Sequence, residues 1–183
     1  LKEHKIELYI AGSGPLSKEL KEQSNGCENI TFIGRVKEPF HFFKSIDLLV
    51  VPSIREPLGN VCLEAGLYRV PVLASNVDGI PEILEHEVSG ELMNPDEELS
   101  FVTNNDAAPL PEYVINPETQ QLQKPSQLNS SKLAKKILEL RLNSEKLDLY
   151  VNNLHLKVIQ NFNLEIYSSK LEGLYRKISS ENK

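Results

Sequence analysis

The chain has 183 residues, of which 40% are apolar and 25% charged, with a net charge of −6. This length and composition are those of one ordinary folded domain, or of one domain with an appendage. The acidic balance argues against nucleic acid as the main partner, because no basic stripe is available. No apolar run approaches the roughly 18 residues that a membrane span needs, and no signal peptide is visible. Because the sequence starts at Leu1 and not at a methionine, we expect a fragment or a processed chain.

The cysteines and histidines of the sequence predict neither a disulfide framework nor a metal site. Two cysteines, Cys27 and Cys62, are too few for a disulfide framework. The four histidines are scattered and no Cys-x2-Cys pair occurs, so no zinc ligand set is predicted. Cys62 lies on the expected buried side of a helix and is predicted to be a small core residue.

The first clear element is a short apolar run, Lys5 to Ala11, that ends in Gly12-Ser-Gly-Pro15. Such a run before glycines predicts a buried strand that enters a tight loop, followed by a helix over 16–23 with Pro15 in its first turn. Gly12 and Gly14 would let the backbone approach a ligand closely. The alternative is that both glycines serve only the geometry of the turn.

The same alternation of apolar strands and helices continues to about residue 95. Further strands are expected at 29–34, 46–51, 70–75 and 89–93, and further helices at 39–45 and from Asp78, where Pro81 suits the first turn. This pattern predicts βαβ units and a parallel sheet covered by helices on both faces. In such sheets ligands bind outside the carboxyl ends of the strands, where four glycine-bearing loops converge: 12–15, 34–36, 53–60 and 75–79.

The stretch from Arg55 to Gly66 is the centre of this prediction. Glu56 and Glu64 enclose seven residues, among them a proline, a glycine and an asparagine. If a helix starts near Gly59, the amides of Leu58 to Val61 are free donors at its N-terminus and form a ready anion site. An anion between two carboxylates suits a sugar nucleotide. The alternative is a plain strand–turn–helix junction with two solvated glutamates.

The character of the chain changes after Asn94. Residues 96–129 are polar and rich in proline, and they predict an insertion or long loop with a hairpin around Asn116. Residues 130–183 predict three amphipathic helices that pack on the same domain, with Ser130 or Ser131 as the first N-cap. His155 is expected to be a surface or interhelical residue. We therefore divide the chain into a Rossmann-like core at 1–95, an insertion at 96–129 and C-terminal helices at 130–183.

The order of several short motifs resembles the C-terminal domain of retaining glycosyltransferases of the GT-B fold, family 4. The motifs are Ala11-Gly-Ser-Gly-Pro15, Phe32-Ile-Gly34, Asp47, Pro52-Ser53, Glu56 with Glu64-Ala65, Pro71-Val72 and Asp78-Gly-Ile-Pro-Glu82 followed by Ser89-Gly90. The two glutamates are the hallmark of that family. The resemblance covers residues 5 to about 95, and the helices over 131–178 look like the family's closing helices.

This resemblance implies the donor-binding half of an enzyme that transfers a sugar from a nucleoside diphosphate sugar with retention of configuration. Glu56 would be the catalytic residue beside the sugar hydroxyls, and Glu64 would bind the ribose hydroxyls. The remaining donor-binding set would be Gly12, Ser13, Gly14, Arg35, Val36, Pro57, Leu58, Gly59 and Asn60, with the amides of 58–60 on the diphosphate or sugar and the backbone of 35–36 on the base. The family needs no metal and no cofactor beyond the donor substrate.

The implied partners are the nucleotide sugar and a glycan or lipid-linked acceptor, which a missing N-terminal domain would bind. The resemblance further implies that the enzyme takes part in polysaccharide or glycolipid synthesis in the cytoplasm. The full-length enzyme would be able to associate peripherally with the cytoplasmic face of the membrane. The fragment alone is expected to be inactive, because the family's basic pair for the diphosphate would lie before Leu1.

The sequence departs from the family in two further places. Val77-Asp78-Gly79 stands where a Gly-Gly pair is usual, which puts close backbone approach there in doubt, and the insertion at 96–129 is unusual. Competing interpretations are a nucleotide-sugar binding or regulatory module without transfer, a sugar-nucleotide epimerase of the same fold, and a flavodoxin-like signalling domain. The last would leave the two glutamates without a role.

Overall fold

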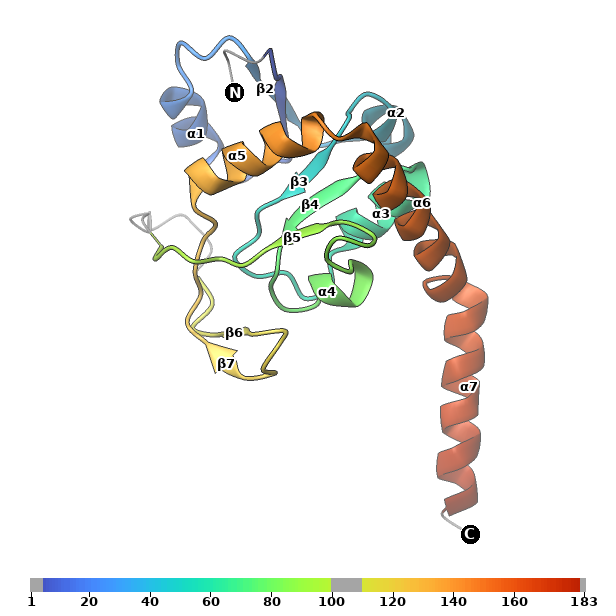
Figure 1. Cartoon of the computed structure of the whole chain (residues 1–183). Helices are drawn as coiled ribbons and strands as arrows, with labels where there is room; N and C mark the ends of the chain where they lie inside the picture. The colour runs from blue at the N-terminus through green and yellow to red at the C-terminus, as the bar shows by residue number, and fades with distance from the viewer. Residues whose placement is uncertain (1–4, 100–109, 182–183) are drawn as a thin grey trace.

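The computed structural model describes residues 5–99 and 110–181. Its strands are β1 (Leu8–Ala11), β2 (Ile30–Gly34), β3 (Leu49–Val51), β4 (Val72–Ser75), β5 (Glu91–Met93), β6 (Val114–Ile115) and β7 (Leu122–Gln123). Its helices are α1 (Ser17–Gln23), α2 (Pro39–Lys44), α3 (Asn60–Tyr68), α4 (Ile80–Ile83), α5 (Ser130–Arg141), α6 (Ser144–Asn161) and α7 (Leu164–Glu181). Figure 1 shows strands and helices alternating along the first half of the chain, as the sequence predicts.

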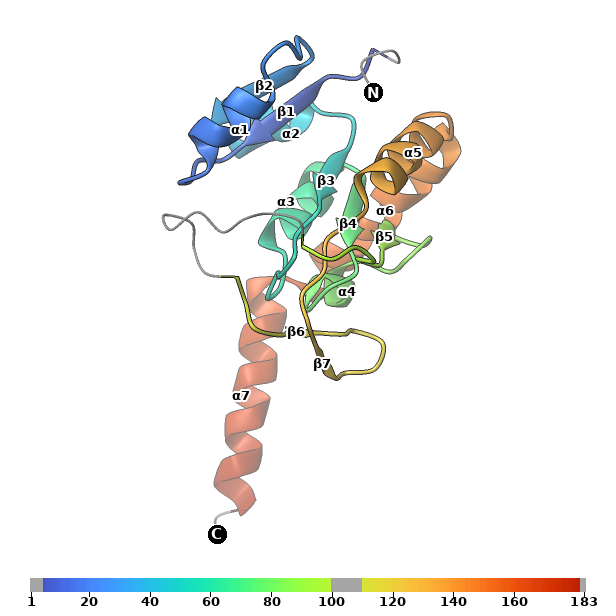
Figure 2. The same ribbon diagram turned by 90° about the vertical axis from the view of Figure 1, so that its left-hand side faces the viewer.

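The first five strands pair only in parallel, but they form two hydrogen-bonded sheets instead of one. β1 pairs with β2, and β4 pairs with both β3 and β5. Figure 2 shows the β1–β2 unit set off from the three-stranded sheet. No residue of β1, α1 or β2 is buried, although the strands are largely apolar. The parallel α/β class is therefore confirmed, while the continuous sheet expected over residues 1–95 is divided between β2 and β3.

The core surrounds β4, whose four residues are all buried. Val72 and Ala74 pack in one cluster with α3, α4 and the second half of α6, whereas Leu73 packs in another with Leu140 and Tyr150. Alternate residues of a strand face opposite sides of its sheet, so both faces are covered by helices. This explains why the strand reads as a continuous apolar run.

A glycine allows α3 to pack closely against α6. A Cβ on Gly66 would lie 2.7 Å from a methyl carbon of Val158 and 2.9 Å from Leu154, so a larger residue would push the helices apart. His155 Nδ1 lies 3.0 Å from the Gly66 carbonyl oxygen. The interhelical position expected for His155 is therefore confirmed.

A buried carboxylate fixes α5 and α6 to the edge strand β5. The side chain of Glu91 is 2% exposed and lies 3.1 Å from Lys136 Nζ and 3.2 Å from Lys146 Nζ. It also accepts a hydrogen bond of 2.7 Å from the Tyr150 hydroxyl. Burial alone would raise the pKa of Glu91, but these hydrogen bonds lower it overall. The sequence analysis did not anticipate this network.

The ends of the C-terminal helices differ in part from expectation. The N-cap of α5 is Asn129 and not Ser130 or Ser131, because the Asn129 side chain accepts a hydrogen bond from the Lys132 amide at 2.9 Å. Asparagine is at least as good a cap as serine. The helix therefore begins one residue earlier than it would with Ser130 as its N-cap. Similarly, Pro15 precedes α1 and is not in its first turn, since the N-cap is Leu16.

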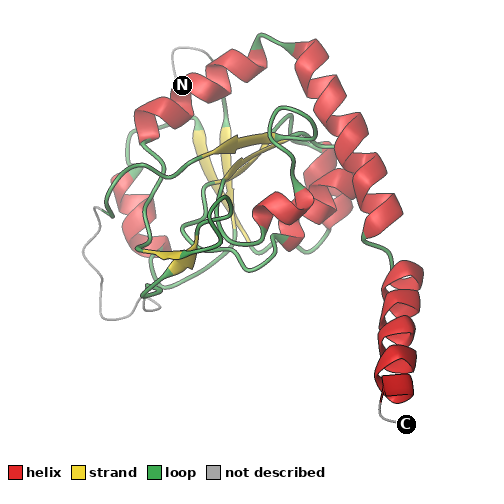
Figure 3. Ribbon diagram, turned by 60° about the horizontal axis from the view of Figure 1, so that its bottom comes forward, coloured by secondary structure: helices red, strands yellow, loops and turns green. Residues whose placement is uncertain are grey.

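The third C-terminal helix does not cover the core as expected. Figures 1 and 3 show α7 extending away from the body of the molecule after a break at 162–163. Several of its apolar side chains, among them Leu164, Tyr167 and Tyr175, are exposed. None of the helices in the described part of the chain combines the length and apolar character needed to cross a bilayer.

Candidate functional site

The segment between β3 and α3 forms the turn that the sequence predicts. Gly59 is the N-cap of α3 and has φ +96°, a left-handed conformation that glycine adopts without steric cost. The amides of Leu58, Asn60 and Val61 have no hydrogen-bond acceptor among the described residues. These are the orphan donors of a helix N-terminus, and they are available to an anion.

The two glutamates of the motif have different surroundings. Glu56 is half-buried, and its Oε1 accepts a hydrogen bond of 3.1 Å from the Gly59 amide. One of the predicted anion-binding amides is thus already capped by the first glutamate. Glu64 is exposed on α3 with no hydrogen bond or ion pair among the described residues, which leaves its carboxylate available to a ligand.

Asp78 holds the Glu56 loop in place, a function that the sequence analysis missed. Its Oδ2 accepts a hydrogen bond of 3.0 Å from the Glu56 amide, and its Oδ1 accepts one of 2.8 Å from the Ile115 amide. Asp78 has φ +43°, a conformation that aspartate tolerates better than most residues. An Asp-Gly pair after a strand was the available signal, because aspartate commonly accepts backbone hydrogen bonds in turns.

The backbone at Gly79 packs closely against the Pro57 segment. A Cβ there would lie 2.1 Å from the Pro57 carbonyl oxygen, and the Gly79 amide donates to the Glu56 carbonyl at 3.1 Å. Only glycine fits this position without moving the backbone. Gly79 thus allows its loop to pack against the Pro57 segment.

The glycine loop after β1 lies beside the end of β2. The Gly12 amide donates to the Gly34 carbonyl at 2.7 Å, and both glycines have positive φ. Gly12, Ser13, Gly14 and Arg35 are exposed, and Val36 is half-buried. The structure thus joins the predicted loops 12–15 and 34–36 as one pair and the loops 53–60 and 75–79 as another. No hydrogen bond connects the two pairs in the described part of the chain.

Cys62 lies beneath the candidate site as a core residue. It is fully buried, as predicted, and its Sγ would be 3.5 Å from a Cβ on Gly59. Burial, and then the charge of Glu56, raise the pKa of the Cys62 thiol to about 12. A thiol with this pKa stays protonated near neutral pH and is not a nucleophile.

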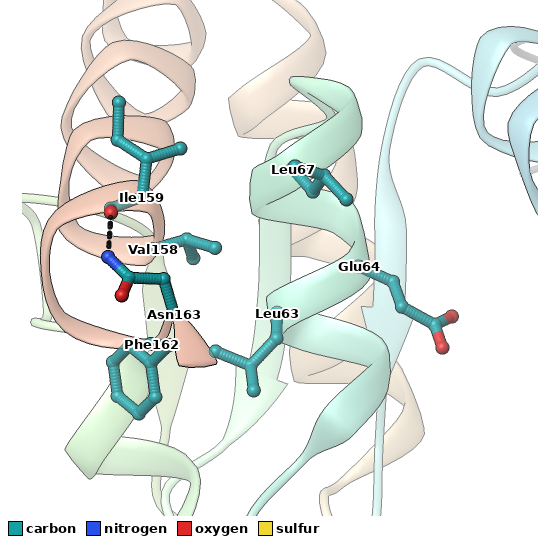
Figure 4. A pocket seen from close by; sticks show the side chains of 7 residues that line it. All are labelled: Leu63, Glu64, Leu67, Val158, Ile159, Phe162 and Asn163. Carbon is teal, nitrogen blue, oxygen red and sulfur yellow. Dashed lines mark hydrogen bonds between the residues drawn. The ribbon is translucent and has the colours of Figure 1, made fainter. Parts of the chain in front are cut away.

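Two hollows adjoin the motif. One, of about 600 Å³, lies between the Arg55–Pro57 segment, the start of α4 and the β6–β7 hairpin. The other, of about 320 Å³, is an apolar groove between α3 and α6. In Figure 4 the Glu64 side chain points away from the Leu63, Val158 and Phe162 side chains of this groove. Glu64 lines this groove, but its carboxylate points away from these apolar side chains.

A cluster of His86, Glu87 and Glu91 has the spacing of metal ligands, since its atoms lie within 4.8 Å of one another. Lys146 Nζ lies 3.0 Å from Glu87 and 3.2 Å from Glu91, so an ammonium group already occupies this position. The two carboxylates of this cluster therefore pair with Lys146 and hold α6 against β5.

A parallel, Rossmann-like core with closing helices is the architecture of the C-terminal half of a GT-B glycosyltransferase. The structure of the Anabaena protein HepE in complex with UDP-glucose superposes with a TM-score of 0.69 over 94% of this chain and 41% of that chain, at 23% identity. At this identity the similarity shows the fold. The family model described as glycosyl transferases group 1 matches residues 1–108, and the chain belongs to this family.

Two curated relatives agree with this assignment. An uncharacterized glycosyltransferase of Methanocaldococcus jannaschii, MJ1607, is 38% identical over 100 residues, which are 52% of this chain and 26% of that protein. The O-antigen biosynthesis glycosyltransferase WbnH of Escherichia coli is 37% identical over 84 residues, 46% of this chain and 25% of that protein. The chain thus spans about a quarter of the length of these relatives.

Proposed function

We propose that this chain is the donor-binding half of a retaining glycosyltransferase that transfers a sugar from a nucleoside diphosphate sugar to a glycan or glycolipid acceptor. The observation that carries the proposal is the start of α3, where free amides lie between two carboxylates. Relatives named for O-antigen synthesis and a neighbour bound to UDP-glucose support a polysaccharide acceptor and a UDP-sugar donor.

The diphosphate would bind at the amides of Leu58 to Val61. Backbone N–H groups at a helix N-terminus favour negative charge, and three of these amides have no partner in the described structure. They would stabilise the charge that develops on the leaving diphosphate without a metal ion. Glu64, exposed and unpaired, would accept hydrogen bonds from the ribose hydroxyls.

Glu56 would change partners when the donor binds. Without a donor, its carboxylate accepts the hydrogen bond of the Gly59 amide. A phosphate oxygen of the donor would accept a hydrogen bond from the same amide. Because two anions on one amide repel each other, a bound diphosphate would release the Glu56 carboxylate toward the sugar. There it would accept hydrogen bonds from the hydroxyls and stabilise the positive charge of the transition state.

The test is calorimetric titration of UDP and UDP-glucose, with GDP and ADP as alternatives, into the wild type and single variants. We expect Glu64→Ala to weaken UDP binding by about 1–3 kcal/mol, the cost of unpairing hydroxyls from a charged acceptor. Glu56→Gln should bind UDP at least as tightly as the wild type, because a charge that competes with phosphate is removed. Glu85→Ala, which removes an exposed carboxylate elsewhere, is the control.

Equal losses in Glu56→Gln and Glu64→Ala would contradict this division of roles. Turnover needs the full-length protein, where Glu56→Gln should depress transfer without weakening UDP binding. A full-length protein that binds the donor but transfers nothing to any acceptor would instead favour a binding or regulatory module.

A further inference from the structure

Asp78 and Gly79 bind both polar groups of the Glu56 main chain. The Glu56 amide donates to Asp78 Oδ2 at 3.0 Å, and the Glu56 carbonyl accepts from the Gly79 amide at 3.1 Å. The Glu56 side chain is held separately, by a hydrogen bond of 3.1 Å from the Gly59 amide to its Oε1. The carboxylate can therefore change its partner by rotation of the side chain alone, while the backbone of residue 56 stays in place.

The Asp78 carboxylate also binds the insertion hairpin β6–β7. Its Oδ1 accepts from the Ile115 amide at 2.8 Å, and the Asp78 amide donates to the Ile115 carbonyl at 3.3 Å. In an antiparallel pair, alternate residues turn their main-chain groups away from the partner strand, and Ile115 turns both of its groups to Asp78. Figure 1 shows the hairpin below the three-stranded sheet, next to the loops that follow its strands. Asp78 thus links the Glu56 loop to the hairpin.

This link joins distant parts of the chain. Aspartate in a turn ordinarily binds amides a few residues away, whereas Asp78 binds amides 22 residues earlier and 37 residues later. Its φ of +43° is a conformation that a residue with a side chain keeps only where surrounding contacts hold it. Each strand of the hairpin has two residues, and such a short ribbon is marginally stable alone. Its position therefore depends on the bonds to Asp78 and on Val114, which is 3% exposed.

We infer that Asp78 is a positioning residue for Glu56 and that the insertion hairpin braces it. The inference rests on the proposed function, in which the Glu56 carboxylate leaves the Gly59 amide for the sugar when the donor binds. A displacement of about 1 Å in a group that acts on the reacting atoms can lower a rate about a hundredfold, so transfer depends on the fixed backbone of Glu56. The amides that Asp78 binds belong to Glu56 and Ile115, whereas the proposed diphosphate site consists of the amides at 58–61. Loss of Asp78 should therefore affect the chemical step and not nucleotide binding.

The test is release of UDP from UDP-glucose by the full-length protein, with GDP- and ADP-glucose as alternatives. Water takes the place of the acceptor, so that the products are UDP and glucose. Asp78→Gly removes both carboxylate bonds but is compatible with the positive φ at this position, so the loop keeps its path. We expect it to lower kcat about tenfold to a hundredfold, while the KM for UDP-glucose and the Kd for UDP stay unchanged. Asp78→Asn keeps one oxygen that accepts a hydrogen bond and should lose less activity. Glu118→Gln, which removes an exposed carboxylate on the same hairpin, is the control.

Two substitutions at Ile115 test the brace itself. Ile115→Pro removes the amide that Asp78 Oδ1 binds, and it removes no bond between β6 and β7 because this amide points away from β7. Ile115→Ala keeps the amide and is the matched control, since the side chain is 44% exposed. We expect Ile115→Pro to lower kcat in the same direction as Asp78→Gly, and Ile115→Ala to leave it unchanged. The double variant of Asp78→Gly and Ile115→Pro should lose no more than Asp78→Gly alone, because both remove the same interaction.

Three results would overturn the inference while the proposed function stands. They are a wild-type kcat in Asp78→Gly, a loss of UDP affinity in Asp78→Gly as large as the loss of kcat, and equal effects of Ile115→Pro and Ile115→Ala. If the wild type releases no nucleotide from UDP-, GDP- or ADP-glucose, the proposed function fails, and the inference fails with it. Hydrogen exchange of the Glu56 amide should be faster in Asp78→Gly and in Ile115→Pro than in the wild type, and circular dichroism shows whether each variant retains the fold.

Discussion

The perturbation that the structure defines most sharply is Glu91→Gln. Glu91 is almost fully buried between β5 and the two helices α5 and α6, and its carboxylate faces the ammonium groups of Lys136 and Lys146. The amide of glutamine is nearly isosteric but carries no charge. The substitution therefore leaves two cations beside a buried neutral group without creating a cavity.

The expected loss of stability follows from the two lysine ammonium groups that the substitution leaves without their charged partner. Removing one partner of a buried ion pair costs about 3–5 kcal/mol. Each lysine side chain is about a fifth exposed and is thus partly screened, which places our expectation at the lower end, about 3 kcal/mol. This is a large share of the roughly 5–15 kcal/mol that stabilises an ordinary domain.

Glu139→Gln provides the matched control, since Glu139 lies 3.1 Å from the same Lys136 but is 56% exposed. We expect a change of less than about 0.5 kcal/mol from it, because exposed ion pairs contribute little. The assay is urea unfolding followed by circular dichroism at neutral pH, with the midpoint and slope compared between variants. Equal effects of the two substitutions would show that burial of the Glu91 ion pairs adds nothing to stability.

The hydrogen bonds and ion pairs of Glu91 also determine in which direction the stability of the fold changes with pH. Because the folded-state pKa of Glu91 is lowered, its stabilisation is complete above the unfolded pKa and is lost as the pH falls through the folded value. Hydrogen bonds and the Glu91 charge raise the pKa of Lys136 and Lys146 despite burial, so their stabilisation is complete below the pKa of unfolded lysine. Stability should therefore fall below about pH 4.3, and Glu91→Gln should flatten that fall.

Two further substitutions and one labelling experiment test other parts of the structure. Gly79→Ala should lower the free energy of unfolding by about 1–3 kcal/mol through the clash with the Pro57 carbonyl, and it should weaken UDP binding. Gly173→Ala, in open space on α7, should raise the free energy of unfolding by up to about 1 kcal/mol. Unchanged urea midpoints for both variants would contradict the packing at these two glycines. Iodoacetamide at pH 8 should label the exposed Cys27 and spare Cys62, as mass spectrometry of the native protein would show. Rapid labelling of both under native conditions would be inconsistent with a buried thiol.

The secondary structure of the core was predictable because its signals are local. Continuous apolar runs followed by glycine-bearing loops located β1 to β4, and the helix that starts after Gly59 follows from the glycine and the apolar face behind it. The parallel pairing follows from the alternation of strands and helices. The division into two sheets was not predictable, since hydrogen bonding between distant strands depends on which edges meet.

The tertiary contacts of the site were less accessible to sequence reasoning. Asp78 looked like a departure from a glycine pair, yet its carboxylate binds the amide of Glu56, 22 residues earlier, and that of Ile115, 37 residues later. Glu91 looked like a polar interruption of a weak strand, and its partners come from helices about 50 residues later. A single sequence contains no periodicity that reports such long-range pairs.

Backbone chemical-shift mapping with UDP on the isotope-labelled chain would show whether the start of α3 is the diphosphate site. We expect the largest, saturable amide shifts at Leu58, Gly59, Asn60 and Val61, with smaller ones along α3 toward Glu64. Phosphate alone should move the same four amides at higher concentration. Saturable shifts confined to other loops, with these four amides unmoved by UDP, would show that the diphosphate binds elsewhere.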